Sequence, residues 1–180
     1  VLKDFRLLAA LPVLAALFFG LAPPQVTDRL YSTFDLQDPT NRDRLAMART
    51  GVRMIQDYPL TGVGPNMVQE VYADYRDANA VQSTNPHLHN VPMQIAAERG
   101  LPALALWLWF VISVVVSSFR RLQTTTYKSL PAGGLAALAS MLAAGLFEYN
   151  FGDSEFLMML LVVITLPYAA DISEQVQDPL

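Results

Sequence analysis

The sequence predicts an all-α, polytopic helical membrane protein with about four transmembrane helices and a long helical loop on the outer side. The first observation is composition: 53% of the 180 residues are hydrophobic, only 16% are charged, and the mean hydropathy is +0.30. An ordinary soluble domain has roughly 45–50% apolar and about 25% charged residues. The second observation is that the apolar residues come in charge-free blocks, and the third is that basic residues flank those blocks.

Charge-free stretches that are candidates for membrane spans cover residues 7–26, 101–119, 129–147 and 156–170. A transmembrane helix needs about 20 apolar residues, with a range of about 17–25. The two middle stretches meet this length and the last one is short. The first contains Pro12 and ends at Pro23 and Pro24, which suits a kinked helix that stops at the interface. A cleaved signal peptide is the alternative for this first stretch.

The short flanks of these stretches carry the basic residues Lys3, Arg6, Arg120, Arg121 and Lys128. Lysine and arginine in short loops stay on the cytoplasmic side. We therefore expect residues 27–100, and the turn around 148–155, to lie outside the cytoplasm. Because the chain opens at Val1 on the approach to a hydrophobic stretch, we expect residues 1–180 to be one membrane domain, the C-terminal portion of a longer protein.

The outer loop begins with an amphipathic helix, predicted over residues 41–57 by a cap at Thr40-Asn41 and a stop at Tyr58-Pro59. The predicted buried face holds the apolar residues that recur at helical spacing, Leu45, Ala48, Val52 and Ile55. The predicted solvated face holds Arg42, Arg49 and Arg53. Arg44 lies at the edge of the apolar face, where a charge is costly without a partner. A functional role and a salt bridge to a loop carboxylate both remain open for it.

A turn over residues 59–66 follows this helix, and its Gly62 and Gly64 permit backbone conformations that are closed to other residues. Exposed amides in such a turn could cradle an anion, and a plain connector is the alternative. After the turn, apolar residues at helical spacing over 68–75 predict a second short helix that ends near Arg76.

Both histidines of the chain lie in the run Asn85-Pro86-His87-Leu88-His89-Asn90-Val91-Pro92. A histidine pair at this spacing can bind metal, but no third ligand of obvious spacing follows, so we expect no metal site. If Asn90 caps a helix with Pro92 in its first turn, His89 lies at the positive end of the helix dipole, where phosphate binds well. A cap-region histidine bonded only to backbone is the alternative.

Other features exclude several classes of function. The chain has no cysteine, which excludes a disulfide framework, a thiolate zinc site and a cysteine nucleophile. A net charge of −4 and an isoelectric point near 5.0 argue against a nucleic-acid binder.

An acidic group on the outer side, Glu148, Asp153 and Glu155, is expected to pin the turn between the last two spans, with contact to an acceptor as the alternative.

Several segments, taken in order, resemble the O-antigen ligase/polymerase superfamily. They are Arg44-Leu45-Ala46-Met47, residues 57–65, Tyr75-Arg76, His87-Leu88-His89-Asn90 and residues 94–102. Residues 145–155 are also similar to a membrane-edge segment of some bacterial members. The chain departs from the pattern at Ala48, where tryptophan is common, and at Ala103, which replaces a glycine that allows close helix approach. Neither change removes a chemical group.

The resemblance implies a glycosyltransferase of the bacterial inner membrane that moves a glycan from undecaprenyl diphosphate to an acceptor hydroxyl at the periplasmic face. The acceptor would be lipid A core for a ligase, or a growing glycan for a repeat-unit polymerase. The loop 27–100 would be periplasmic and catalytic, with an essential arginine at Arg44, an essential histidine at His89 and a recurrent arginine at Arg76. The family is metal-independent, and we expect no cofactor.

From the residues and the resemblance together, the expected catalytic residues are His89 and Arg44, and the expected substrate-binding residues are Arg76, Asn90, Gly62 and Gly64. Arg44 would stabilise charge on the leaving diphosphate. His89 would accept the proton of the attacking hydroxyl, or hold a phosphate oxygen. The expected partners are the donor, the acceptor and membrane lipids.

The alternatives are a protein O-glycan ligase and a non-catalytic transporter or structural membrane module. A transporter usually carries ionisable residues at mid-membrane depth. The stretches 101–119 and 129–147 have none, which favours chemistry at the membrane surface.

Overall fold

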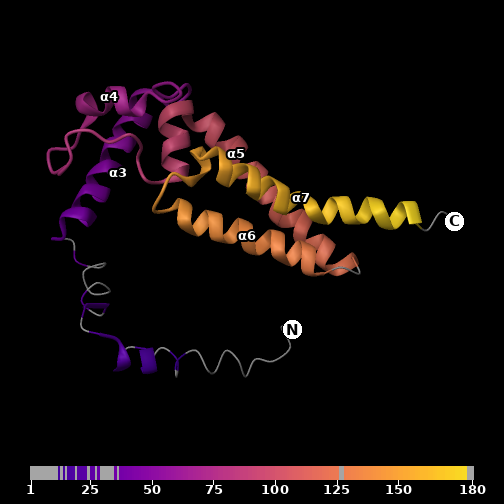
Figure 1. Cartoon of the computed structure of the whole chain (residues 1–180). Helices are drawn as coiled ribbons and strands as arrows, with labels where there is room; N and C mark the ends of the chain where they lie inside the picture. Colours follow the sequence, from indigo (N-terminus) through magenta and orange to yellow (C-terminus); the bar gives the residue numbers. More distant parts are fainter. Residues whose placement is uncertain are drawn as a thin grey trace. The chain divides into compact units, whose positions relative to one another are not determined.

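The computed structural model describes residues 37–125 and 128–177, together with isolated positions between 12 and 35. Residues Val1–Arg42 and Asp43–Leu180 form two units, and, apart from the cap of the first helix described below, the contacts that follow lie within the second. Its regular elements are α3 (Pro39–Asp57), α4 (Val68–Tyr75), α5 (Val91–Thr124), α6 (Ser129–Gly145), the short 3-10 helix η1 (Asn150–Gly152) and α7 (Ser154–Gln177) (Figure 1). The described residues contain no strand, which confirms the all-α class.

Within the described part of the chain, α5 is the one helix that is both long and apolar enough to cross a membrane. Helix α6 and the apolar part of α7, Ser154–Ala170, are shorter apolar helices. The predicted span 7–26 falls largely outside the described residues. One span thus meets the length criterion, and the expected set of four is not established.

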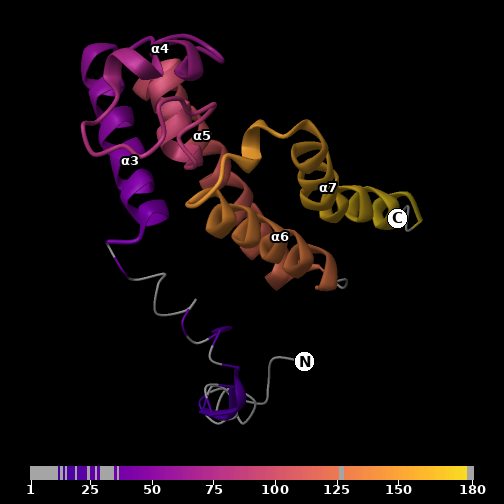
Figure 2. The ribbon, with the colours of Figure 1, turned by 60° about the vertical axis from the view of Figure 1, so that its left-hand side comes forward.

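Helices α5, α6 and α7 pack around one apolar core, with α6 in contact with both of the others (Figures 1 and 2). The buried core residues are Val91, Ile95, Trp107, Val111, Val114, Leu138, Met141, Leu160 and Ile164. The α6–α7 connection lies beside the beginning of α5, because the Asn90 side-chain amide donates a hydrogen bond of 3.2 Å to the Leu146 carbonyl. The connection between α6 and α7 thereby brings residues near 148 close to the segment that contains the histidines.

Helix α3 ends at the predicted residue, but it begins earlier than predicted and buries a different face. The predicted cap at Thr40-Asn41 was wrong: the first turn is capped by Asp38, whose carboxylate accepts a 2.8 Å hydrogen bond from the Thr40 amide. The buried residues of α3 are Asp43, Ala46, Met47, Thr50, Gly51 and Met54. The predicted buried face was therefore wrong for Leu45 and Val52, which are 45% and 44% exposed, whereas Ala48 and Ile55 are half-buried.

The physical reason is that the polar residues on the buried face have partners. The Asp43 carboxylate accepts hydrogen bonds from the Val81 and Gln82 amides at 2.8 and 3.0 Å. The Thr50 hydroxyl accepts one from the Asp77 amide at 3.1 Å. A buried polar group that is hydrogen-bonded avoids most of the cost of leaving water, so periodicity of apolar residues alone selects the wrong side.

The turn after α3 is joined to α5 at a break in the α5 helix. Gly100 has φ 79° and ψ 171°, and Pro102 has no amide hydrogen to donate, so the carbonyls of Ala97 and Glu98 lose their usual helical donors. The Val63 and Gly64 amides replace them at 2.8 and 3.0 Å, while the Leu101 amide donates to the Pro59 carbonyl at 2.7 Å.

Glycine is required on both sides of this junction. A Cβ on Gly62 would collide with the backbone of Glu98, and a Cβ on Gly100 would collide with the Leu60 carbonyl. Both residues also have positive φ, at 66° and 79°. The loop that follows α3 is consequently fixed to the first turns of α5, which lie directly after the histidines.

Candidate functional site

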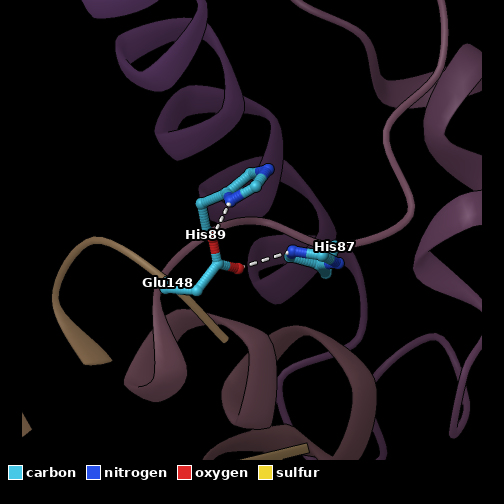
Figure 3. A group of neighbouring side chains, drawn as sticks. All are labelled: His87, His89 and Glu148. Atoms are coloured by element: carbon cyan, nitrogen blue, oxygen red, sulfur yellow. Dashed lines mark hydrogen bonds and ion pairs between the residues drawn. The ribbon is translucent and has the colours of Figure 1, made fainter. Parts of the chain in front are cut away.

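The two histidines lie on either side of the carboxylate of Glu148 (Figure 3). His87 Nε2 lies 2.7 Å from Oε1, and His89 Nδ1 lies 3.0 Å from Oε2. The two imidazole rings are tilted to each other, with centroids 4.3 Å apart. We refer to His87, His89 and Glu148 as the His–Glu cluster. Its side chains are partly open to solvent, at 29%, 28% and 53% exposed.

The cap of α5 positions the histidines. As predicted, Asn90 is the N-cap, and its side-chain oxygen accepts a 2.9 Å hydrogen bond from the Met93 amide. His89 precedes this cap and has φ 49°, an unusual value for a residue with a side chain. Between the histidines, the Leu88 amide donates to the side-chain oxygen of Gln94 at 2.8 Å.

Gln94 is in turn held by Glu98, because its side-chain amide donates to the Glu98 carboxylate at 2.9 Å. Both side chains are almost completely buried, with residues 1% exposed. Arg99 supplies the opposite charge through a 3.1 Å hydrogen bond to the same carboxylate. A buried polar chain of this kind fixes the backbone between the histidines to the body of α5.

The charge state of Glu148 fixes the protonation of its partners. Burial alone would raise its pKa, but the hydrogen bonds donated by the Tyr149 amide, His89 and His87 outweigh burial, and the pKa of Glu148 lies below its usual value. An ionised carboxylate only accepts hydrogen bonds. The ring nitrogens that face it, His87 Nε2 and His89 Nδ1, therefore carry protons. In neutral His89 this leaves the lone pair on Nε2.

Arg44 reaches the same part of the structure through Phe147, the neighbour of Glu148. Its guanidinium carbon lies 5.8 Å from the centroid of the Phe147 ring, within the range of a cation–π contact. Arg44 itself is exposed. The structure thus brings Arg44 close to the segment that carries Glu148. The sequence analysis did not predict this contact.

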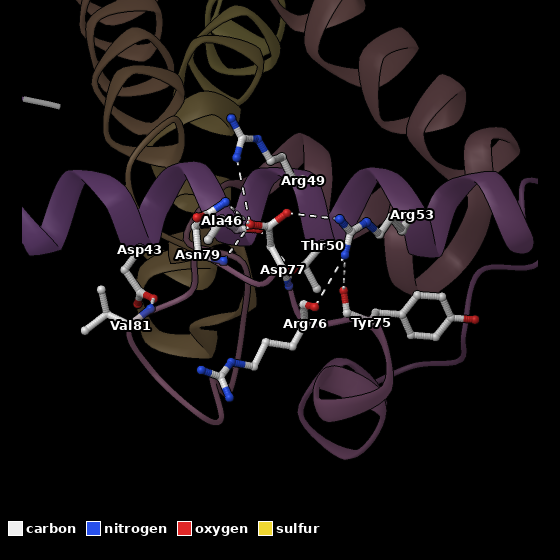
Figure 4. A network of polar contacts seen from close by, with 10 residues as sticks. All are labelled: Asp43, Ala46, Arg49, Thr50, Arg53, Tyr75, Arg76, Asp77, Asn79 and Val81. Carbon is white, nitrogen blue, oxygen red and sulfur yellow. Dashed lines mark hydrogen bonds and ion pairs between the residues drawn. The ribbon is translucent and has the colours of Figure 1, made fainter. Parts of the chain in front are cut away.

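Two of the three arginines of the predicted solvated face, Arg49 and Arg53, have a structural partner in Asp77 (Figure 4). Arg53 donates to the Asp77 carboxylate at 3.0 Å, and Arg49 lies 3.8 Å from it. The hydrogen bond from the Asn79 backbone amide is the largest cause that lowers the Asp77 pKa, and the two arginines add to it. This network fastens the end of α4 to α3.

The four expected substrate-binding residues have structural contacts. Arg76 donates to the Ala80 carbonyl at 3.0 Å, and in Figure 4 its guanidinium points away from Asp77. Both polar atoms of the Asn90 side chain are engaged. The amides of Gly62 and Gly64 donate to backbone carbonyls. Contact of any of these four with substrate stays a prediction.

An apolar cavity of about 330 Å³ opens between α5 and α6, and part of its lining comes from residues next to the His–Glu cluster in the chain. Val91 and Pro92 line one side, immediately after the cap, and Gly145 and Leu146 line the other, immediately before Phe147. Trp107 forms part of the wall. The segments that carry the His–Glu cluster therefore also supply part of the wall of an apolar cavity.

Glu148 is the candidate site residue whose contacts with the histidines the sequence analysis did not predict. It was expected to pin a turn together with Asp153 and Glu155. Asp153 does so, since its carboxylate accepts hydrogen bonds from the Glu155 and Phe156 amides at 3.1 and 3.3 Å. Glu148 also accepts a hydrogen bond from the Tyr149 amide in this turn at 2.9 Å, and in addition it contacts histidines 59 and 61 residues away. The available signal was the predicted topology, which placed residues 27–100 and 148–155 on one side of the membrane.

Comparison with known proteins completes the description of this site. The sequence model of the O-antigen ligase family matches residues 1–108, which include Arg44 and both histidines. No curated protein and no solved structure matches the chain. Since the match spans more than half of the 180 residues, the chain belongs to the O-antigen ligase family, whose members are membrane-associated enzymes of the glycosyltransferase type.

Proposed function

We propose that this protein moves a glycan from undecaprenyl diphosphate to an acceptor hydroxyl at the periplasmic face of the bacterial inner membrane. The acceptor is lipid A core in a ligase, or a growing glycan in a repeat-unit polymerase. The observation that carries the proposal is the His–Glu cluster, whose neighbours in the chain, Val91, Pro92 and Leu146, line an apolar cavity. A lipid-linked glycan also combines an apolar part, the lipid chain, with a polar end at which the reaction takes place.

In the proposed topology, α5, α6 and α7 cross the membrane together with a fourth helix over residues 7–26, and residues 27–100 are periplasmic. This arrangement places the basic connection between α5 and α6 on the cytoplasmic side, in agreement with the positive-inside rule. The His–Glu cluster then lies where the outer ends of α5 and α6 meet the periplasm.

In the proposed reaction, the acceptor oxygen attacks the anomeric carbon while the bond from that carbon to the diphosphate oxygen breaks. His89 Nε2 accepts the hydroxyl proton, and Glu148 holds the imidazole in the tautomer that this requires. Arg44 stabilises the negative charge that develops on the leaving diphosphate. Because the proton acceptor and the charge partner are both protein side chains, the proposed reaction needs no metal ion.

The decisive experiment reconstitutes the complete protein in liposomes with an undecaprenyl-diphosphate glycan, alone and with lipid A core. The products are resolved on a gel for the wild type and for His89→Ala. A ladder without added acceptor identifies a polymerase, and a shifted band that requires lipid A core identifies a ligase. His89→Ala is expected to lower transfer by about 100-fold to 10,000-fold, the usual range for a general base.

A second variant separates the two roles open to His89. His89→Gln places an amide hydrogen-bond donor near the position of Nε2, so it can still hold a phosphate oxygen but cannot accept a proton. Loss of transfer in both variants supports the base. Retention in His89→Gln assigns His89 to phosphate binding, and a product that does not depend on His89 at all refutes the proposed site.

A further inference from the structure

The His–Glu cluster has the composition of a transition-metal site. One ligand atom from each of its three residues lies within 4.8 Å of the others. Zinc binds imidazole nitrogen at about 2.0–2.1 Å and carboxylate oxygen at about 2.0–2.2 Å, so the ligand atoms of one tetrahedral ion are roughly 3.3 Å apart. The His87–Glu148 and His89–Glu148 separations of 2.7 and 3.0 Å are close to this spacing.

We propose that His87, His89 and Glu148 bind a divalent transition-metal ion, Zn²⁺ by preference, and that the bound ion inhibits glycan transfer. Two imidazoles and one carboxylate suit zinc and its neighbours in the first transition row. They do not suit Mg²⁺ or Ca²⁺, which take oxygen ligands almost exclusively. The inhibitory half of this inference rests on the proposed function, whereas the binding half does not.

The third ligand comes from a separate part of the chain. The histidines precede α5, and Glu148 lies between α6 and α7. The histidine segment is held by the Asn90 cap and by the Gln94 contact with the Leu88 amide. The side chain of Glu148 is 53% exposed, so its carboxylate can rotate until one oxygen meets the ion. The exposed side of the cluster gives the ion an entry path and leaves a fourth position for water.

The reason for inhibition lies in the tautomer of His89. Without metal, the proton of the neutral ring is on Nδ1, directed at Glu148, and the lone pair on Nε2 is the proposed base. A metal ion binds a lone pair, so coordination at Nδ1 moves the ring proton to Nε2. No net proton is lost from the imidazole. Nε2 becomes a hydrogen-bond donor and can no longer accept the proton of the acceptor hydroxyl.

Binding is tested on the complete protein in lipid nanodiscs, purified without a polyhistidine tag and stripped of metal with EDTA. Isothermal titration with ZnCl₂ is expected to give one ion per chain, and MgCl₂ no binding. His87→Asn and Glu148→Gln each remove one ligand and are expected to weaken Zn²⁺ binding by at least about 10-fold, given that loss of even an outer contact costs 10–100-fold. Glu155→Gln, in the same connection but outside the cluster, is the matched control and should bind as the wild type does.

Folding of the variants is checked by Tm. The visible absorption of bound Co²⁺ reports which residues are ligands. No saturable Zn²⁺ binding, or binding that is the same in His87→Asn, Glu148→Gln and Glu155→Gln, overturns the site. Active transfer together with no binding overturns only this inference and leaves the proposed function intact. Stoichiometric binding in a protein without transfer in any condition supports the site and refutes the proposed function.

Inhibition is measured in the liposome assay with increasing Zn²⁺, each variant being compared with its own metal-free rate. The wild type is expected to lose transfer over the concentration range in which Zn²⁺ binds, and EDTA should restore it. The midpoint for His87→Asn should move to at least about 10-fold higher Zn²⁺, in proportion to its weakened affinity. Binding without inhibition overturns the coupling between this ion and the base.

Discussion

Replacement of Glu148 by glutamine tests whether the carboxylate acts through His89 or only joins two segments. The glutamine side chain has nearly the same volume and keeps one acceptor oxygen, but it has no charge. Its amide can also donate a hydrogen bond to Nδ1, which stabilises the wrong tautomer of His89. We therefore expect slower transfer in Glu148→Gln with little change in folding.

The magnitude follows from the contacts of the carboxylate. A hydrogen bond to a charged group contributes about 1.5–3 kcal/mol, which corresponds to a factor of about 13–160 in rate when it is lost only in the transition state. Because the Glu148 side chain is 53% exposed, solvent screens part of this contribution. We expect a loss near the lower end, about 10–30-fold in kcat, with a KM that changes little.

The assay is single-turnover transfer in liposomes at saturating donor, followed from pH 5 to pH 9. If Glu148 orients His89, the rate of transfer by Glu148→Gln lies below the wild-type rate at every pH in this range. Glu148→Asp, which keeps the charge, recovers part of the lost rate. A structural role predicts instead a lower Tm with a normal rate per folded molecule. Wild-type kcat in Glu148→Gln, or the same loss in Glu155→Gln, would refute the orienting role.

Three further predictions concern the supporting residues. Arg44→Lys is expected to lower kcat/KM by at least about 10-fold, because an ammonium does not reproduce the planar bidentate fork of the guanidinium, and full activity would reduce Arg44 to a general electrostatic contact. Gln94→Leu leaves the buried Leu88 amide without its acceptor and should destabilise the fold by about 1–3 kcal/mol in chemical unfolding, whereas Gln69→Leu at an exposed position of α4 should not. The pKa of Asp77 is lower in the folded chain than its ordinary 3.8, so the unfolded chain binds more protons as the pH falls through that value. The stability that Asp77 contributes is present above about pH 4 and lost below it, and unfolding curves of Asp77→Asn should show a weaker dependence on pH in this window.

Two helix boundaries were predictable because they depend on local chemistry. A stop at Tyr58-Pro59 and a cap at Asn90 agree with the end of α3 and the start of α5, whereas the start of α3 was predicted two residues too late. The buried face of α3 was not predictable in the same way. It is decided by the partners of Asp43 and Thr50, which lie in the segment around residues 77–82 and become neighbours only when the loop has folded back on α3.

The same distinction applies to the site. The position of His89 at the head of a helix followed from two residues within three positions of it, a capping asparagine and a proline. Its partner Glu148 lies 59 residues away, and the contact depends on how α6 and α7 pack against α5. No spacing in the sequence encodes that packing. The expectation of no metal ligand set rested on the same missing contact, because a third ligand was sought near the histidine pair.

The candidate site is divided between two parts of the chain, and the expected losses of transfer rate can be ranked accordingly. The family match covers residues 1–108 and includes His89 and Arg44, whereas Glu148 lies outside it. The groups that touch the reacting atoms in our proposal thus belong to the region shared with the family, and the group that sets the tautomer of His89 belongs to the remainder. Removal of the base should cost at least about 100-fold, and removal of the orienting charge less, about 10–30-fold. An equal or larger loss in Glu148→Gln than in His89→Ala would contradict this order.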